Sequence, residues 1–194
     1  MTGHENSLLL VVFCIFSSTA AIQLFYYFFF YLKVCLYRAP ETKSIGQPVS
    51  VIICARNEAE NLSNFLPAIL EQNYPHYEVI VVNDCSEDNS YDILGKYLSL
   101  YPHLKISTVN KDPKFTHNKK FAQFIGIKAA KNELLLFTDA DCQPESDRWL
   151  EGMTSHFNEK TIFVLGYGGY KREKGLLNLY IRYDCLTIAM QYFG

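Results

Sequence analysis

The chain has 194 residues and a formal net charge of −2. This length allows one domain with a substantial core and leaves little room for a second. A nearly neutral charge excludes the basic footprint of a nucleic-acid-binding protein, so we expect no nucleic-acid partner. The six cysteines show no CxxC pair and no metal-type spacing, which fits a reduced compartment where most of them act as small apolar side chains.

A long apolar run without charge, Leu8–Leu32, lies near the N-terminus. As a helix with a rise of about 1.5 Å per residue, it is long enough to cross a hydrocarbon layer of about 30 Å with some tilt. A cleavable signal peptide and a buried core helix are the alternatives. The small residues at 17–21 fall in the middle of the run, with more aromatic side chains after them, and this order favours a retained anchor.

Basic residues at 33, 38 and 43 follow the apolar run, whereas only His4 and Glu5 precede it. By the positive-inside rule, we expect a single-pass protein of the cell membrane in which everything after Lys33 is cytoplasmic. The sequence therefore predicts four parts: an N-terminal tail at 1–7, a transmembrane anchor at 8–32, a linker at 33–47 and a soluble domain at 48–194.

Beyond the linker, apolar runs typical of buried strands alternate with segments in which apolar side chains recur at helical spacing. Strands are predicted at Val49–Cys54, Tyr77–Asp84, Leu104–Asn110, Glu133–Thr138 and Thr161–Gly166. Helices are predicted at Arg56–Gln72, after the SEDNS segment at 86–90, and at His117–Lys131 and Asp147–Phe157. This alternation predicts an α/β fold with a mostly parallel sheet and helices on both faces.

Polar clusters follow three of these predicted strands: RNE at 56–58, ND at 83–84 and DAD at 139–141. In parallel sheets, ligands bind beyond the carboxyl ends of the strands. If the three strands are neighbours, we expect the clusters to meet at one rim of the sheet and to form an active site there.

The DAD cluster contains two carboxylates, Asp139 and Asp141, that have the same side-chain parity in an extended segment. Two close carboxylates raise each other's pKa unless a cation bridges them. Mg²⁺ or Mn²⁺ is the natural bridge, because these ions commonly join carboxylates to substrate phosphates. The alternative is that the two aspartates only end the strand in solvent or cap the next helix.

Two further groups are candidate ligand contacts. Asp84 follows a strand and could accept hydrogen bonds from a ribose hydroxyl or a base, or else serve only as a turn or cap residue. Lys119 and Lys120 begin a predicted helix, where they could meet a diphosphate or simply belong to a solvated face.

Taken together, the segments VSVIICARNEAENL, VIVVNDCSEDNS and KKFAQFIGIKAAKNELLLFTDADC, in this order, resemble the family 2 glycosyltransferases. The resemblance covers about Pro48 to Gly169. It implies the GT-A fold, a Rossmann-like and mostly parallel sheet. It also implies a transferase that moves a sugar, with inversion, from a nucleotide-diphosphate donor, most commonly a UDP-sugar. The predicted membrane anchor suggests a cell-envelope or lipid-linked acceptor for this membrane-anchored transferase.

The resemblance implies a role for each matched residue. The loop at 55–58 would line the nucleotide pocket, and Asp84 would contact the base or ribose. Lys119 would lie near the ribose and phosphates, and the two aspartates of the DAD motif would hold ribose and a metal-bound diphosphate. Phe124 stands where the family has an asparagine. The implied nucleotide-sugar-binding residues are Ala55, Arg56, Asn57, Glu58, Asp84, Lys119 and Asp139, and the implied ligands of Mg²⁺ or Mn²⁺ are Asp139 and Asp141.

A catalytic base for the acceptor hydroxyl is missing from this pattern. In the family it lies well beyond the DxD motif, often in an acidic pair, and no acidic residue after Asp141 sits in a convincing pair. Glu145 and Asp147 are typical of a helix start, and Asp184 lies in an aromatic stretch. We therefore expect the base to lie beyond Gly194, in an acceptor half that this chain lacks.

Two other functions stay open at this point. A non-catalytic, membrane-anchored module that binds nucleotide sugars would keep the pocket and lack the base. A phosphatase of the haloacid dehalogenase type also places DxD after an apolar strand. That motif, however, normally lies on the first strand, with Thr or Val two residues after the second aspartate, where this chain has Gln143.

Overall fold

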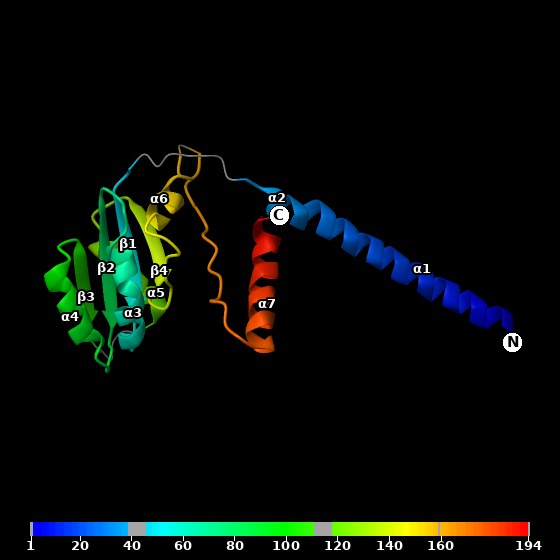
Figure 1. Cartoon of the computed structure of the whole chain (residues 1–194), viewed down its shortest axis with the longest axis horizontal. Coiled ribbons are helices and arrows are strands. Elements are labelled where there is room, and N and C mark those ends of the chain that lie inside the picture. The colour runs from blue at the N-terminus through cyan, green and yellow to red at the C-terminus, as the bar shows by residue number, and fades with distance from the viewer. Residues whose placement is uncertain (1, 39–45, 111–117, 159, 194) are drawn as a thin grey trace. The chain divides into compact units, whose positions relative to one another are not determined.

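The computed structural model describes residues 2–38, 46–110, 118–158 and 160–193 (Figure 1). The chain forms two compact units. One combines Met1–Glu41 with Tyr167–Gly194, and the other spans Thr42–Gly166. The second unit contains the sheet and every residue that the sequence assigns to a site.

A parallel sheet of four strands forms the centre of this second unit. Its strands are β1 (Val49–Ala55), β2 (Tyr77–Asp84), β3 (Leu104–Val109) and β4 (Leu134–Asp139), in the spatial order β3-β2-β1-β4. β1 and β2 are almost entirely buried, because β-branched side chains fill both faces of a sheet that helices cover. The first four predicted strands are confirmed, with ends that differ by a residue or two.

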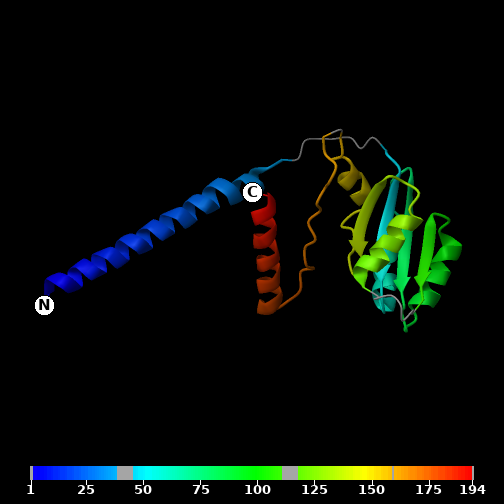
Figure 2. The same ribbon diagram turned by 180° about the vertical axis from the view of Figure 1, so that it is seen from behind.

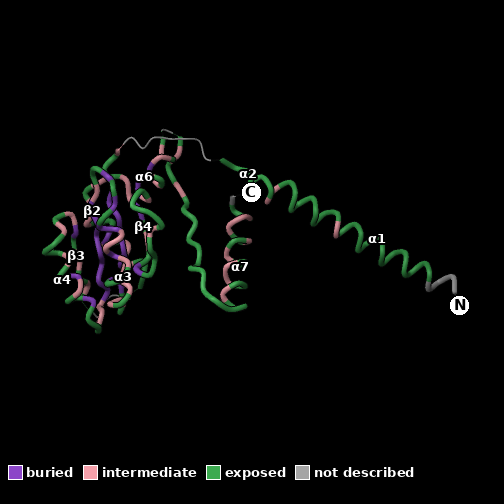
Figure 3. Tube along the Cα trace, viewed as in Figure 1, coloured by how far each residue is buried: buried purple, intermediate pink, exposed green. Residues whose placement is uncertain are grey.

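Helices cover both faces of the sheet, as expected (Figures 1 and 2). On one face, Val51 and Ile53 of β1 belong to a core cluster with Leu66 of α3 (Ala59–Leu70), Leu94 of α4 (Ser90–Leu100) and Leu150 of α6 (Trp149–Thr154). Figure 3 shows this buried core concentrated along the strands. The three helices predicted at Arg56–Gln72, His117–Lys131 and Asp147–Phe157 are present but shorter than expected.

The opposite face of the sheet carries one helix, α5 (Lys119–Ala129), through a small cluster of Ile80, Val82 and Ala122. Gly126 allows the helix to approach closely, because a Cβ at this position would lie 2.5 Å from Ile52 Cγ2. The N-terminus of α5 is fixed by Asn118, whose side chain accepts a hydrogen bond from the Phe121 amide at 2.9 Å. The position of α5 therefore depends on tight packing and on a side-chain cap.

The predicted fifth strand is wrong. Residues 161–166 form no strand, and one antiparallel bridge between Asn158 and Thr161 is the only pairing described for this segment. Ile162 is 91% exposed and Phe163 is 74% exposed. The apolar pattern is typical of a buried strand, but a strand also requires a neighbouring strand, and no strand in the described part of the chain pairs with these residues.

The N-terminal part is helical over the whole predicted apolar run. It consists of α1 (Thr2–Tyr26), a π-helical turn η1 (Tyr27–Tyr31) and α2 (Leu32–Leu36). Among the described residues, the span Asn6–Leu36 alone is long and apolar enough to cross a membrane, and that crossing stays a prediction. Its exposed leucine and phenylalanine side chains point outward along its length.

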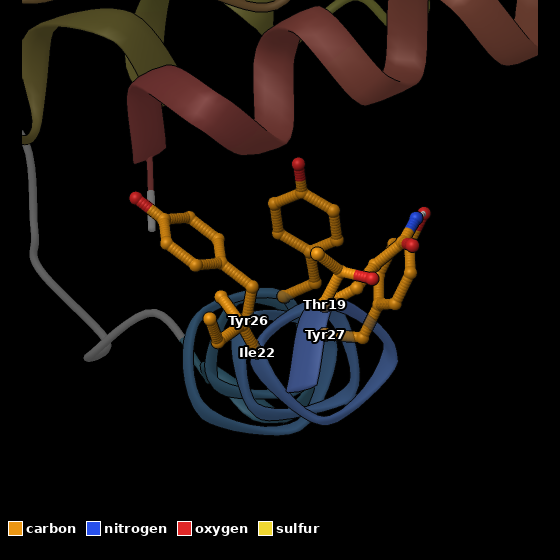
Figure 4. Close-up of a pocket in the computed structure, with 6 residues that line it drawn as sticks. Thr19, Ile22, Tyr26 and Tyr27 are labelled. Carbon is orange, nitrogen blue, oxygen red and sulfur yellow. Dashed lines mark hydrogen bonds between the residues drawn. The ribbon is translucent and has the colours of Figure 1, made fainter. Parts of the chain in front are cut away.

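A shallow hollow of about 290 Å³ lies along this helix beside Thr19, Ile22, Tyr26 and Tyr27 (Figure 4). The side chain of Gln23 donates a hydrogen bond to Tyr27 Oη at 3.3 Å. Among the described residues, no charged side chain lines the hollow, and none of the residues that the sequence assigns to a site lies there. The same compact unit also contains the helix α7 (Leu176–Phe193).

Candidate functional site

A pocket of about 270 Å³ opens beyond the carboxyl ends of β1, β2 and β4. The topology accounts for its place. The chain runs from β1 outward to β2 and β3 and then crosses to the other side of β1 to form β4, so the strand order changes direction at β1. Such a switch in strand order opens a crevice at the carboxyl edge of a parallel sheet.

Most of the residues predicted from the sequence line this one pocket. They are Ala55, Arg56, Glu58, Asp84, Lys119, Asp139 and Asp141. Further lining residues, to which the sequence had assigned no role, are Cys54, Asn118, Ala122 and Ala140. Asn57 was predicted to line the nucleotide pocket, and it is not among the lining residues.

Side-chain alternation explains why acidic groups gather here. Ile80 and Val82 of β2 face α5, so Asp84, two residues further on, lies on the same side of the sheet. Cys54 of β1 packs on that side as well, and it is the register partner of Asp139 on β4. The helix that covers this face begins at Lys119, so a lysine meets the carboxyl edge of the sheet.

Lys119 and Asp139 form an ion pair across the pocket. Lys119 Nζ lies 2.6 Å from Asp139 Oδ1, and the two side chains are 59% and 53% exposed. The hydrogen bond with Asp139 raises the pKa of Lys119, so the ammonium stays charged at neutral pH. Burial raises the pKa of the nearby Cys54 thiol, which is therefore neutral under the same conditions.

The loop after β1 is fastened to the loop after β2 through Asn57. Its backbone has a left-handed φ of 56°, which asparagine tolerates better than most residues. The Asn57 amide donates to Ser86 Oγ at 3.0 Å, and Asn57 Oδ1 accepts from the Glu87 amide at 2.8 Å. Asn57 thus holds two strand-end loops together, while its neighbours Arg56 and Glu58 face the pocket.

Asp88 makes a second connection between the same loops. Its Oδ2 accepts from the Ala59 amide at 2.9 Å, at the start of α3, and its Oδ1 accepts from the Ser90 amide at 3.0 Å, at the start of α4. Burial raises the pKa of Asp88, but these hydrogen bonds outweigh it and bring that pKa below its usual value. The sequence indicated cap-type residues at 86–90 but not that one of them serves both helices.

The pocket carries an excess of negative charge. Four lining carboxylates, from Glu58, Asp84, Asp139 and Asp141, face two lining cations, from Arg56 and Lys119, which gives a formal charge of −2. Among the described residues, no group of three or more His, Cys, Asp or Glu side chains is arranged to hold a metal ion. A cation bound by Asp139 and Asp141 would therefore need other ligands, such as water or the oxygens of a bound molecule.

Comparison with known proteins places the chain among glycosyltransferases. The sequence profile of Glycosyl transferase family 2 matches residues 50–193. The chain is similar to Glycosyltransferase AglE of Haloferax volcanii, with 33% identity over 120 residues that cover 61% of this chain and 38% of AglE. It is also similar to the putative teichuronic acid biosynthesis glycosyltransferase TuaG of Bacillus subtilis, with 28% identity over 124 residues that cover 63% of this chain and 46% of TuaG.

A solved structure confirms the expected fold. The mannosyltransferase PcManGT from Pyrobaculum calidifontis, in complex with GDP-Man and Mn²⁺, is similar with a TM-score of 0.61 and 23% identity. The match covers 77% of this chain and 44% of PcManGT. The GT-A architecture predicted from the sequence is therefore confirmed. The chain spans less than half the length of each of these three proteins.

Proposed function

Because the chain belongs to glycosyl transferase family 2, we propose that its strand-end pocket is the donor site of a glycosyltransferase. The protein would move a sugar from a nucleotide-diphosphate donor to an acceptor with inversion. One observation carries the proposal: three motifs that lie far apart in the sequence line a single pocket at the switch point of a parallel sheet.

The charge of the pocket supports a metal-assisted donor site. A nucleotide diphosphate would bring further negative charge to a lining that already has a formal charge of −2. Mg²⁺ or Mn²⁺ held by Asp139 and Asp141 would offset this repulsion and, once bound, would stabilise the leaving nucleotide diphosphate as a Lewis acid. The two carboxylates fit such an ion, because Mg²⁺ is usually bound by one or two carboxylates with phosphate oxygens and water completing its shell.

The remaining lining residues would orient the donor. Asp84, at the end of β2, is suited to accept hydrogen bonds from a ribose hydroxyl or a base. Lys119, at the start of α5, is suited to contact the phosphates, and the N-terminus of a helix favours an anion in the same way. Arg56 would add a second cation on the side of β1.

The acceptor and the membrane belong to the same proposal. TuaG is named for the synthesis of teichuronic acid, and this name supports a cell-envelope or lipid-linked acceptor. The apolar helix Asn6–Leu36 supports a single-pass anchor in the cell membrane, and the basic residues after it support a cytoplasmic donor site. Fusing a reporter that is active on one side of the membrane to residue 194 would test this orientation.

The donor site can be tested by removing the charge of one carboxylate at either end of β4 and comparing the two variants. Asp141→Asn changes the pocket, whereas Glu133→Gln changes an exposed carboxylate just before the amino end of β4. We expect Asp141→Asn to weaken Mn²⁺-dependent binding of UDP or GDP at least about tenfold, because a metal-bridging charge is lost. Glu133→Gln should bind like the wild type in the same titration calorimetry. Equal effects of the two changes would remove the metal from the proposal.

A further inference from the structure

The proposed metal ligand Asp139 is already paired with a cation that belongs to the chain. Lys119 Nζ lies 2.6 Å from Asp139 Oδ1, which is a short, charge-assisted contact. The two residues come from different elements, the first turn of α5 and the last position of β4. The Asn118 cap and the close packing of Gly126 hold the start of α5 where its lysine reaches that carboxylate.

We propose that Lys119 is a built-in counter-ion that occupies the Asp139 carboxylate until a nucleotide diphosphate arrives. The pocket then takes up its divalent cation together with the nucleotide and binds it only weakly alone. This inference rests on the proposed donor site, and it adds a role for Lys119 in coupling metal binding to nucleotide binding. In this proposal Lys119 has two alternative partners. It pairs with Asp139 when the pocket is empty and with the phosphates when a nucleotide is bound.

The ion pair between Lys119 and Asp139 is weak enough for Lys119 to exchange Asp139 for a phosphate. Both side chains are more than half exposed, and ion pairs at such positions are weak. The lysine carries its charge on a flexible four-carbon stem, so it can turn from one partner to another without movement of α5. A buried pair of the same length would hold its lysine too firmly for this role.

The charges around the pair account for the coupling. A divalent cation that enters alone must compete with Lys119 for Asp139, and no group of three or more His, Cys, Asp or Glu side chains among the described residues is arranged to hold it. A nucleotide diphosphate removes both obstacles to metal binding. It gives Lys119 another anion to pair with, and it gives the metal further oxygen ligands. Because coupling between two ligands is reciprocal, the metal should strengthen nucleotide binding by the same factor.

The test compares Mn²⁺ binding with and without nucleotide. Free Mn²⁺ is measured by its paramagnetic resonance signal in solutions of the full chain, alone and with saturating UDP or GDP. In Lys119→Met we expect Mn²⁺ alone to bind about fivefold more tightly, which is the gain expected from removing a weak ion pair. Binding of UDP or GDP in the presence of Mn²⁺ should weaken, because the phosphates lose the same lysine. A change that only disturbed the structure would weaken both.

Two variants separate competition from a general change in charge. Arg56→Met removes the same charge from the same pocket without removing the partner of Asp139, so it should tighten Mn²⁺ binding clearly less than Lys119→Met does. Lys119→Arg keeps a cation beside Asp139 and should retain the wild-type ratio of Mn²⁺ affinities with and without nucleotide.

Each outcome decides the proposal. Opposite shifts in Lys119→Met, larger than those in Arg56→Met, support it. Unchanged Mn²⁺ affinity in Lys119→Met, or equal shifts in the two variants, would overturn the counter-ion role while leaving the donor site intact. If the wild type binds neither Mn²⁺ nor UDP nor GDP under any of these conditions, the donor site fails and the counter-ion role fails with it.

Discussion

Glu78 and Asp139 are both carboxylates paired with a lysine in one sheet, but they lie at its opposite ends. Glu78, near the amino end of β2, is 1% exposed, and its Oε2 lies 2.7 Å from Lys105 Nζ. Its Oε1 accepts hydrogen bonds from Ser50 Oγ at 2.6 Å and from the Lys131 amide at 2.9 Å. Asp139, at the carboxyl end of β4, is half exposed and is paired with Lys119 alone among the ion pairs described.

This contrast separates a structural carboxylate from one that is available to a ligand. A buried charge is tolerated only when several donors satisfy it, and the surroundings of Glu78 supply them. In the pocket around Asp139, the cations Lys119 and Arg56 face four carboxylates, so negative charge is left in excess on the protein side. The carboxylate of the same type of ion pair is thus buried and satisfied at one end of the sheet and exposed at the other.

The largest effect on the free energy of unfolding is expected at the amino end of the sheet, at Glu78. Glu78→Ala should destabilise the fold by about 3 kcal/mol, because it leaves buried donors and a lysine without their partner. Asp139→Ala should cost less than about 1 kcal/mol, since an exposed pair contributes little. Urea unfolding followed by circular dichroism measures both. Similar losses for the two variants would contradict the contrast between the ends of the sheet.

The next largest loss of stability is expected for substitutions in α5, the helix that runs between the two ends of the sheet. Gly126→Ala adds a Cβ that would lie 2.5 Å from Ile52 Cγ2, and such overpacking costs about 1–3 kcal/mol. Gly95→Ala in α4 is the matched control, because nothing lies within 4 Å of its added Cβ. The control should be neutral or stabilising by up to about 1 kcal/mol. A neutral Gly126→Ala in the same unfolding experiment would show that α5 packs less closely than described.

A smaller loss of stability, with an effect on binding, is expected at the loops that border the pocket. Asp88→Ala removes acceptors from the first amides of α3 and α4 and should cost about 1 kcal/mol. It should also weaken UDP or GDP binding, because it releases the loop that carries Arg56 and Glu58. Asp92→Asn, an exposed change in the first turn of α4, is the control. Thermal melts and calorimetry would show whether the two effects occur together.

The smallest expected effect is a loss of stability that occurs only at acidic pH. Burial raises the pKa of Glu78, but hydrogen bonds from Lys105, Ser50 and the Lys131 amide outweigh it, so that pKa lies below its usual value. The unfolded value is about 4.3, so this contribution to stability is complete above that pH and is lost as the pH falls through the folded pKa. The melting temperature of the wild type should therefore fall more steeply below about pH 4.3 than that of Glu78→Gln. If the melting temperatures of the two proteins fall in parallel with pH, the lowered pKa of Glu78 is contradicted.

Much of the architecture could be predicted from local sequence. The runs that became β1 and β2 are continuous and β-branched, so length and composition indicate buried parallel strands. Because the ends of parallel strands share one edge, the RNE, ND and DAD clusters could be expected to meet there, and residues of all three line the pocket.

Other features depend on contacts between distant segments, which no local pattern contains. Thr161–Gly166 has the composition of a strand, but its state depends on a partner elsewhere. Asn57 was assigned to the pocket, yet its left-handed backbone turns its side chain to the next loop. The pair between Lys119 and Asp139 depends on how far α5 lies along the sheet, which is set by packing at Gly126.

The most direct measurement of the donor site is a crystal structure of the protein grown with Mn²⁺ and UDP or GDP, with data collected for the anomalous signal of manganese. We expect a manganese peak in contact with the carboxylates of Asp139 or Asp141 and with the diphosphate, and we expect Lys119 to be turned toward the phosphates. A nucleotide bound away from the carboxyl ends of β1, β2 and β4, or a nucleotide in the pocket without manganese beside these aspartates, would contradict it.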